Sequence, residues 1–222
     1  MPSPEIRDAL LLSLRVAVLA TALNAVIGIP LAYALARRRF RGKALVDLAV
    51  TLPLVLPPTV TGYYLIVLLG RRGWLGAPLY QATGWTIAFT WYAAVVAATV
   101  MALPLLVRTA RAAIESVDRD LEKAAYTLGR SDWRTTLEVT LPLARNGILA
   151  GLVLAFARAL GEFGATLMLA GNIPGRTATV PLAIYTAVQT GEQDVALALV
   201  ATLTVLSCVV LIAAGRLGAR AT

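Results

Sequence analysis

The sequence predicts an all-α, polytopic membrane protein with about five transmembrane helices and a polar, helical loop before the fourth of them. Hydrophobic residues make up 59% of the 222 residues, and the mean hydropathy is +0.76, whereas soluble domains contain about 45–50% apolar residues. Only 14% of the residues are charged, too few to cover the surface of a water-soluble protein of this size. We expect one membrane domain with no appended soluble module.

Five apolar segments are long enough to cross a bilayer, which takes about 20 residues in a helix. These predicted spans are residues 9–36, 44–70, 86–107, 147–170 and 194–215.

The distribution of basic residues predicts the orientation, because cytoplasmic loops carry an excess of Lys and Arg. Fourteen of the twenty Lys and Arg residues lie after the first span, after the third span and in the C-terminal tail, and four lie on the other side. We therefore expect the N-terminus outside and the C-terminus in the cytoplasm. Arg15 and Arg158 lie within spans. Since orientation accounts for most of the net charge of +8, no nucleic-acid partner is expected.

The composition excludes several classes of site. The chain has no histidine and one cysteine, Cys208, so a zinc cluster of cysteines and an intrachain disulfide are excluded. We expect Cys208 to be a small buried apolar residue. Gly42-Lys43 lacks the other residues of a phosphate-binding loop. No catalytic constellation and no metal site are expected, and the chain is not expected to hydrolyse ATP by itself.

Residues 121–142 form a polar segment between long apolar runs, with two short helices predicted to meet at Gly129. In the first helix, residues 121–128, apolar or small side chains recur at helical spacing, which predicts a face fit for docking. Gly129 suits a left-handed helix stop. Ser131 is expected to cap the second helix, residues 132–138, and Pro142 to open the following segment.

This loop resembles the cytoplasmic coupling loop of ABC importer permeases. The residues that match the family motif are Glu122, Ala124, Ala125, Gly129, Val139, Leu141 and Pro142. The general consensus places its acid directly before the alanines, where this chain has Lys123, and the molybdate-type branch often has the acid one position earlier. The alternative is an amphipathic surface loop that contacts no partner.

Two other segments contain candidate pathway residues. Prolines at 53, 57 and 58 interrupt the second predicted span, and interrupted spans often line substrate sites in transporters. Thr59 and Thr61 would offer hydroxyls there. The alternative is a kinked packing helix whose threonines bond their own backbone.

In the fourth span, small residues recur every four positions, which predicts close helix packing; they are Gly147, Gly151, Ala155 and Ala159. Arg158 and Glu162 are four residues apart and so share one face. They either line the pathway or form a structural ion pair, in which Glu162 neutralises Arg158.

Residues 155–176 and 180–185 look like the molybdate/tungstate branch of the oxyanion importers. The resemblance implies a homodimer in the prokaryotic plasma membrane, with two separate ABC ATPase subunits and an external solute-binding protein. ATP and Mg would be bound by the ATPases, so no cofactor is expected on this chain. Residues 1–222 would form one permease domain with its pathway at the dimer axis. Glu122 would pair with a basic group of the ATPase or cap a helix start.

Three kinds of alternative remain open. The chain could belong to an importer for sulfate, phosphate, amino acids or another small solute. It could instead be a channel without an ATPase, or an integral membrane enzyme. Arg71, Arg72 and Arg176 are expected outside, where they would dock a binding protein, attract an oxyanion or be ordinary solvated charges.

Overall fold

The computed structural model describes residues 4–219, with side chains from Ile6 to Ile212. Within that range the chain is helical and contains no strand. The elements are α1 (Pro4–Arg37), α2 (Lys43–Val55), α3 (Pro58–Leu69), α4 (Gly76–Thr83), α5 (Trp91–Glu115), α6 (Arg119–Thr127), α7 (Asp132–Thr135), the π-helix η1 (Thr136–Thr140), α8 (Leu141–Leu160), α9 (Gly164–Ala170), α10 (Val180–Thr190) and α11 (Gln193–Ala219).

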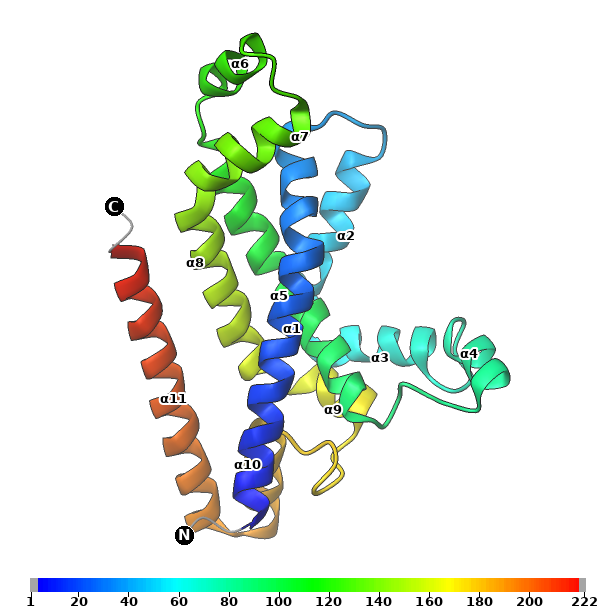
Figure 1. Cartoon of the computed structure of the whole chain (residues 1–222). Coiled ribbons are helices and arrows are strands. Elements are labelled where there is room, and N and C mark those ends of the chain that lie inside the picture. The colour runs from blue at the N-terminus through cyan, green and yellow to red at the C-terminus, as the bar shows by residue number, and fades with distance from the viewer. Residues whose placement is uncertain (1–3, 220–222) are drawn as a thin grey trace.

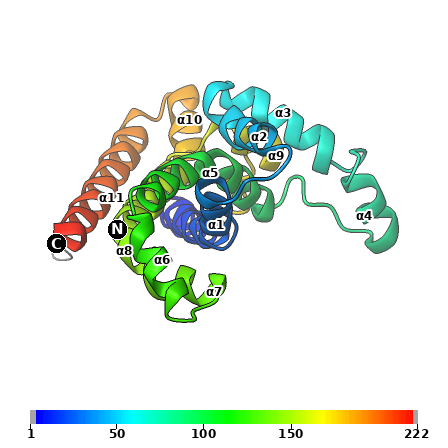
Figure 2. The same cartoon turned by 90° about the horizontal axis from the view of Figure 1, so that it is seen from above.

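Helix α5 forms the centre of the molecule, and α1 and α8 pack along it (Figures 1 and 2). Its buried face is rich in alanine, which lets the neighbouring backbones approach closely. A Cβ added at Gly147 of α8 would lie 2.3 Å from the Cβ of Ala113, and one added at Gly151 would lie 3.0 Å from Leu106. The predicted small-residue stripe of α8 is therefore a packing surface against α5.

Gly147→Val is expected to destabilise the protein, because the added side chain cannot fit against Ala113 without separating α5 from α8. Overpacking of this kind costs roughly 1–3 kcal/mol. The measurement is thermal unfolding of the purified protein in detergent. Ala150→Val is the matched control, since Ala150 is exposed on the same helix. Equal unfolding temperatures for the two variants would contradict the packing role of Gly147.

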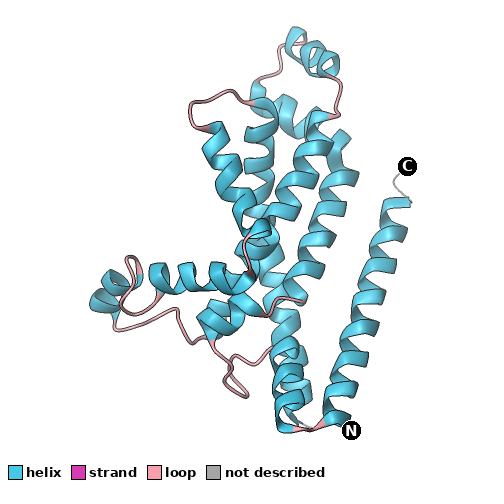
Figure 3. Cartoon of the chain, turned by 180° about the vertical axis from the view of Figure 1, so that it is seen from behind, coloured by secondary structure: helices cyan, strands magenta, loops and turns pink. Residues whose placement is uncertain are grey.

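Within the described residues, four helices are long and apolar enough to span a membrane, and the second predicted span is not one of them. The four segments are Ile6–Arg37, Trp91–Glu115, Asp132–Leu160 and Gln193–Ile212. Residues 44–70 instead form α2 and α3, of 13 and 12 residues, separated at Leu56 and Pro57. Pro57 and Pro58 lack N–H groups, so the helix cannot continue through them. Helix α3 turns away from the bundle (Figures 1 and 3) and packs on α9.

The third and fourth predicted spans also have different boundaries. Helix α5 starts five residues later than predicted and continues beyond the apolar run to Glu115. The fourth span begins at Asp132 and its helix ends at Leu160. The residues after Leu160 form a corner that leads into the short helix α9.

Helix α11 packs on α10 and α8 through its earlier turns, where Leu199 is buried, and its later turns diverge from the bundle (Figures 1 and 3). Cys208 on this helix is exposed, so the prediction that it is buried is wrong. Large apolar side chains also cover the outer faces of α1 and α11, including Val26, Ile27, Val205 and Val209. Such exposed apolar faces suit contact with lipid, and the prediction of a polytopic α-helical membrane protein is confirmed.

Candidate functional site: the α6–α7 loop and the α8–α9 corner

Helices α6 and α7 lie at one end of the bundle, beyond the ends of α1 and α8 (Figure 1). Helix α6 starts at Arg119, two residues before the predicted start, because Asp118 caps it. The Asp118 carboxylate accepts a hydrogen bond from the Asp120 N–H at 2.9 Å, which satisfies a free donor of the first turn. The Lys123 ammonium donates a hydrogen bond to the Asp120 carboxylate at 2.7 Å. This bond raises the pKa of Lys123 and lowers the pKa of Asp120, so both exposed side chains stay charged at neutral pH.

Gly129 ends α6 in the left-handed conformation that the sequence predicts, with φ of 79°. Its N–H donates to the Tyr126 carbonyl at 2.9 Å, and the Arg130 N–H donates to the Ala125 carbonyl at 3.0 Å. These two bonds form a Schellman motif, which satisfies the last carbonyls of α6 and reverses the chain. Ser131 then occupies the N-cap of α7, where its carbonyl accepts from the Thr135 N–H at 2.9 Å while its side chain forms no capping bond.

A π-helical turn joins α7 to α8, so the second predicted helix does not stop at residue 138. The Leu141 N–H donates to the Thr136 carbonyl, five residues earlier. In a regular α-helix the ring of Pro142 would clash with the Glu138 carbonyl, and the wider turn relieves that clash. Pro142 opens α8, as the sequence predicts. Leu141 is half-buried and packs on the core, and Val139 is half-buried too.

Glu122 forms a buried ion pair with Arg37, at the C-terminal end of α1. The Arg37 Nε donates to the Glu122 Oε1 at 3.0 Å, and the exposed fractions of the two side chains are 7% and 11%. Thr140 Oγ1 donates to the same oxygen at 2.7 Å, and Arg37 Nη2 donates to the Val117 carbonyl at 2.8 Å. One cluster thus ties α1, α6 and η1 together.

The expectation that Glu122 pairs with a basic group of an ATPase is therefore wrong, because its partner lies within the chain. The sequence reasoning missed Arg37, which it counted only as a sign of orientation. Arg37 and Glu122 are 85 residues apart, and no local pattern connects them. One signal was available in the sequence. Arg37 lies at the end of the first apolar run, on the side of the membrane where the loop with Glu122 is also predicted.

The outer face of the loop carries large apolar side chains. Leu121, Tyr126, Leu128 and Trp133 are 49%, 42%, 82% and 70% exposed, and we call these four residues the loop patch. Ala124 is exposed beside them, whereas Ala125 faces inward. Partial burial raises the pKa of the Tyr126 hydroxyl, and the negative charge of Asp132 raises it further. The hydroxyl therefore stays protonated at neutral pH. An apolar patch on an otherwise polar loop is typical of an interaction site.

The motif residues thus divide into two groups. Glu122 and Leu141 contact the bundle, Ala125 is buried and Val139 is half-buried, whereas Ala124, Gly129 and Pro142 lie on the exposed surface of the loop. A Cβ added at Gly129 would meet no atom of the chain within 4 Å. The surface at this turn is therefore open to contact from outside.

The candidate pathway residues lie around the corner between α8 and α9, where α3 packs. Arg158 Nη1 lies 2.8 Å from Glu162 Oε2, and the side chains are 27% and 2% exposed. Glu162 Oε1 also accepts from the Ala165 N–H at 2.8 Å, so the same carboxylate caps the start of α9. Arg158 and Glu162 therefore lie side by side, as their spacing predicts. Glu162 also has a structural role, because it stabilises the start of α9.

Thr59 and Thr61 reach this corner on α3. A Cβ on Gly62 would lie 2.8 Å from the Ala165 Cα, and one on Gly164 would lie 2.9 Å from the Pro58 Cβ, so α3 and α9 are in close contact. Thr59 is exposed. Thr61 is buried, and its hydroxyl has no hydrogen-bond partner within the part of the chain that the structure describes. The alternative in which both threonines bond their own backbone therefore does not hold for Thr61.

Comparison with known proteins gives consistent matches over most of the chain. Residues 26–222 match the family described as "Binding-protein-dependent transport system inner membrane component". The "Molybdenum transport system permease protein ModB" of Escherichia coli (strain K12) is 53% identical over 191 residues, which are 85% of this chain and 83% of that protein. The "Sulfate transport system permease protein CysW" of Synechococcus elongatus is 39% identical over 178 residues, 80% of this chain and 62% of that protein.

Among solved structures, the chain is similar to one of a bacterial ABC transporter involved in the import of the acidic polysaccharide alginate. The match covers 98% of this chain and 80% of the chain in that structure. The TM-score is 0.78 at 18% sequence identity, which supports the fold. The family match and the ModB identity establish that the chain belongs to the family of inner membrane components of binding-protein-dependent transport systems.

Proposed function

We propose that this chain is the permease subunit of an ATP-driven importer for molybdate, and also for tungstate. The observation that carries the proposal is the 53% identity to a molybdenum permease over 85% of the chain, a stretch so long that it includes both the coupling loop and the α8–α9 corner. The sulfate permease match is weaker, at 39% identity. Residues 1–222 act as one permease domain, and two copies enclose the pathway.

The α6–α7 loop is the contact for a separate ATPase in this proposal. The chain contains no phosphate-binding loop, so a partner must bind ATP and Mg and supply the energy. The loop patch offers an apolar contact, and the buried Arg37–Glu122 pair holds the loop firmly against α1 and η1. A push on α6 is therefore transmitted to α1 and, through η1, to α8. Such a contact drives transport because it differs between the two states of the transporter.

The orientation follows from the same contact. The end that carries α6 is cytoplasmic, in agreement with the excess of Lys and Arg in its loops. The end where α1 begins then faces outward, toward an external solute-binding protein. The C-terminus lies on the cytoplasmic side.

The test of the function is ATPase stimulation in the complete complex, reconstituted in proteoliposomes with its ATPase and binding protein. Molybdate and tungstate are expected to stimulate ATP hydrolysis and uptake, while sulfate, phosphate and an amino acid are not. Stimulation by sulfate alone would assign the chain to the sulfate importers. Uptake that proceeds without ATP would favour a channel.

We further propose that the substrate passes the corner formed by Thr59, Thr61, Arg158 and Glu162. Arg158→Gln is expected to slow molybdate uptake at least about tenfold, equivalent to roughly 1.4 kcal/mol. The variant is also expected to lose stability, because the buried Glu162 carboxylate keeps its bond from the Ala165 N–H but loses its cation, so uptake is compared per amount of folded, assembled transporter. Arg145→Gln, an exposed arginine at the start of the same helix, is the control. Unchanged uptake in Arg158→Gln would leave the ion pair a purely structural role.

A further inference from the structure

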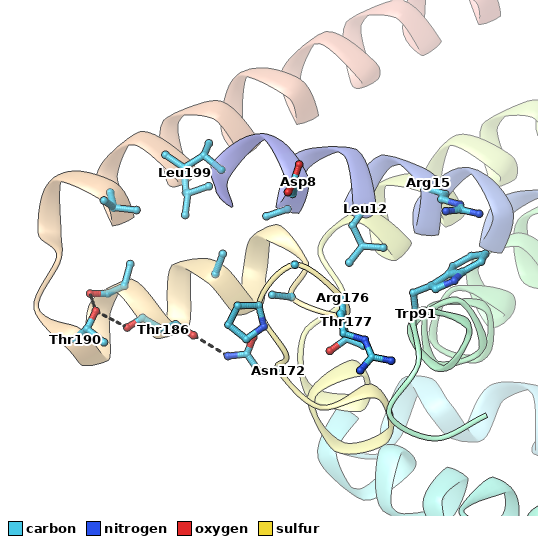
Figure 4. A pocket seen from close by; sticks show the side chains of 18 of the residues that line it. Asp8, Leu12, Arg15, Trp91, Asn172, Arg176, Thr177, Thr186, Thr190 and Leu199 are labelled. Carbon is cyan, nitrogen blue, oxygen red and sulfur yellow. Dashed lines mark hydrogen bonds between the residues drawn. The ribbon is translucent and has the colours of Figure 1, made fainter. Parts of the chain in front are cut away.

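A cavity of about 730 Å³ lies at the end of the molecule opposite α6, between the start of α1, α10, α11 and the loop that precedes α10 (Figure 4). This volume falls within the range of about 300–1,000 Å³ that is typical of binding sites for small molecules and cofactors. Neither the coupling loop nor the α8–α9 corner contributes a residue to its lining.

Arg15 lines this cavity and has no counter-charge among the side chains that the structure describes. It lies in the apolar run of α1, and its guanidinium carbon lies 3.9 Å from the centre of the Trp91 ring. Within residues 6–212, Arg15 forms no ion pair. An arginine in a membrane span costs at least about 2.5 kcal/mol, and the stacking on Trp91 offsets only part of that cost. An anionic partner from outside the chain would stabilise it.

A second arginine, Arg176, lines the same cavity from the loop before α10. Figure 4 shows both arginines toward the end of the cavity where Trp91 lies. Arg176 is exposed, and it too forms no ion pair with the side chains that the structure describes. Asn172 and Thr186 add polar groups to the lining and are joined by a hydrogen bond of 2.7 Å. Two free guanidinium groups at one site favour a phosphate or a similar tetrahedral anion.

The position of Arg15 indicates where that anion comes from. The exposed face of α1 is otherwise apolar beyond the cavity, with exposed side chains at Leu11, Val18, Leu19, Leu23, Val26 and Ile27. That face suits contact with lipid, and Arg15 is an exposed charged residue at its edge, two turns after the exposed Asp8. The cavity also has apolar walls, which include Leu12 of α1 and Leu199 of α11. A ligand with both a phosphate and an acyl chain fits this site, because the phosphate can bind the two arginines while the acyl chain packs on the apolar walls.

Carboxylates line the cavity as well, and they discriminate between possible anions. Asp8 and Glu192 both contribute to the lining, and Asp8 lies 3.6 Å from Arg7. Asp8 is paired with Arg7, whereas Glu192 forms no ion pair with the described side chains, and its negative charge disfavours a free, doubly charged oxyanion. It favours a headgroup that carries an amine beside its phosphate.

We propose that this cavity binds the headgroup of a zwitterionic phospholipid of the phosphatidylethanolamine class. Arg15 and Arg176 bind the phosphate, and the ammonium group lies toward Glu192. The apolar walls and the lipid-facing side of α1 hold the start of the acyl chains.

The test is native mass spectrometry of the assembled transporter, released from nanodiscs that contain equal amounts of phosphatidylethanolamine and phosphatidylglycerol. The wild type is expected to retain phosphatidylethanolamine in preference to phosphatidylglycerol. Arg176→Gln, in an exposed loop, should lower the retained amount at least tenfold, and Glu192→Gln should remove the preference between the two lipids. Arg72→Gln is the control, because Arg72 is exposed but does not line the cavity.

Three results would overturn the proposal. One is equal lipid retention in Arg176→Gln and the wild type. Another is displacement of the lipid by millimolar molybdate or inorganic phosphate, which would assign the site to a free oxyanion. The third is a structure of the assembled transporter in which the second subunit fills the cavity. The readout needs no transport activity, so it is independent of the proposed substrate.

Discussion

Replacing Leu128 with aspartate is expected to reduce recovery of the ATPase with the permease at least about 30-fold, without lowering the unfolding temperature of the permease itself. Leu128 is 82% exposed at the end of α6, so its loss removes little packing within the chain. Burying a leucine side chain contributes about 1.5–3 kcal/mol, and a loss of about 2 kcal/mol corresponds to the expected factor. The measurement is co-purification at fixed ATPase concentration.

Leu128→Met is the matched control, because it keeps an apolar side chain of similar size at the same position. It should recover most of the ATPase. If Leu128→Asp retains the ATPase as well as Leu128→Met does, the loop patch is an ordinary exposed surface and its proposed role is wrong.

Replacing Arg37 with methionine is expected to destabilise the permease by roughly 3–5 kcal/mol and to uncouple ATP hydrolysis from uptake. The change leaves the Glu122 carboxylate buried without its cation, the costliest way to break a buried ion pair. Because Glu122 ties α6 to η1 through Thr140, the loop would lose its firm attachment to the bundle. Thermal unfolding and the ratio of ATP hydrolysed to molybdate imported are the measurements.

Two further variants separate the buried pair from ordinary surface charge. Arg37→Met combined with Glu122→Met should recover most of the lost stability, since apolar side chains can replace a buried pair at little cost. Arg38→Met should cost at most about 1 kcal/mol, because the Arg38–Asp132 pair, at 3.0 Å, is more than half exposed. A loss in Arg38→Met as large as that in Arg37→Met would contradict the special role of the buried cluster.

Local patterns predicted the features that depend on neighbouring residues. Gly129 ends a helix because the left-handed conformation suits a residue without a side chain, and Pro57 and Pro58 interrupt a span because they lack N–H groups. The apolar runs predicted a helical membrane protein. The stripe in α8 predicted a packing face, which lies against α5.

Features that depend on distant residues were not predictable in the same way. The direction in which Glu122 points is set by Arg37 and Thr140, from two other elements. Ala125 faces the bundle while Ala124 does not, although both lay on the face predicted to dock. The end of α5 at Glu115 also exceeds its apolar run, because the last turns of that helix are stabilised by packing such as that of Ile114.

The central claim is that a separate ATPase binds the α6–α7 loop, and site-specific photo-cross-linking from position 128 tests it most directly. With a photoreactive residue in place of Leu128, the assembled transporter should form a covalent adduct with the ATPase. The same residue in place of Val205, an exposed apolar position on α11, should not form that adduct. An intact, ATP-hydrolysing complex that gives no ATPase adduct from position 128 would contradict the account.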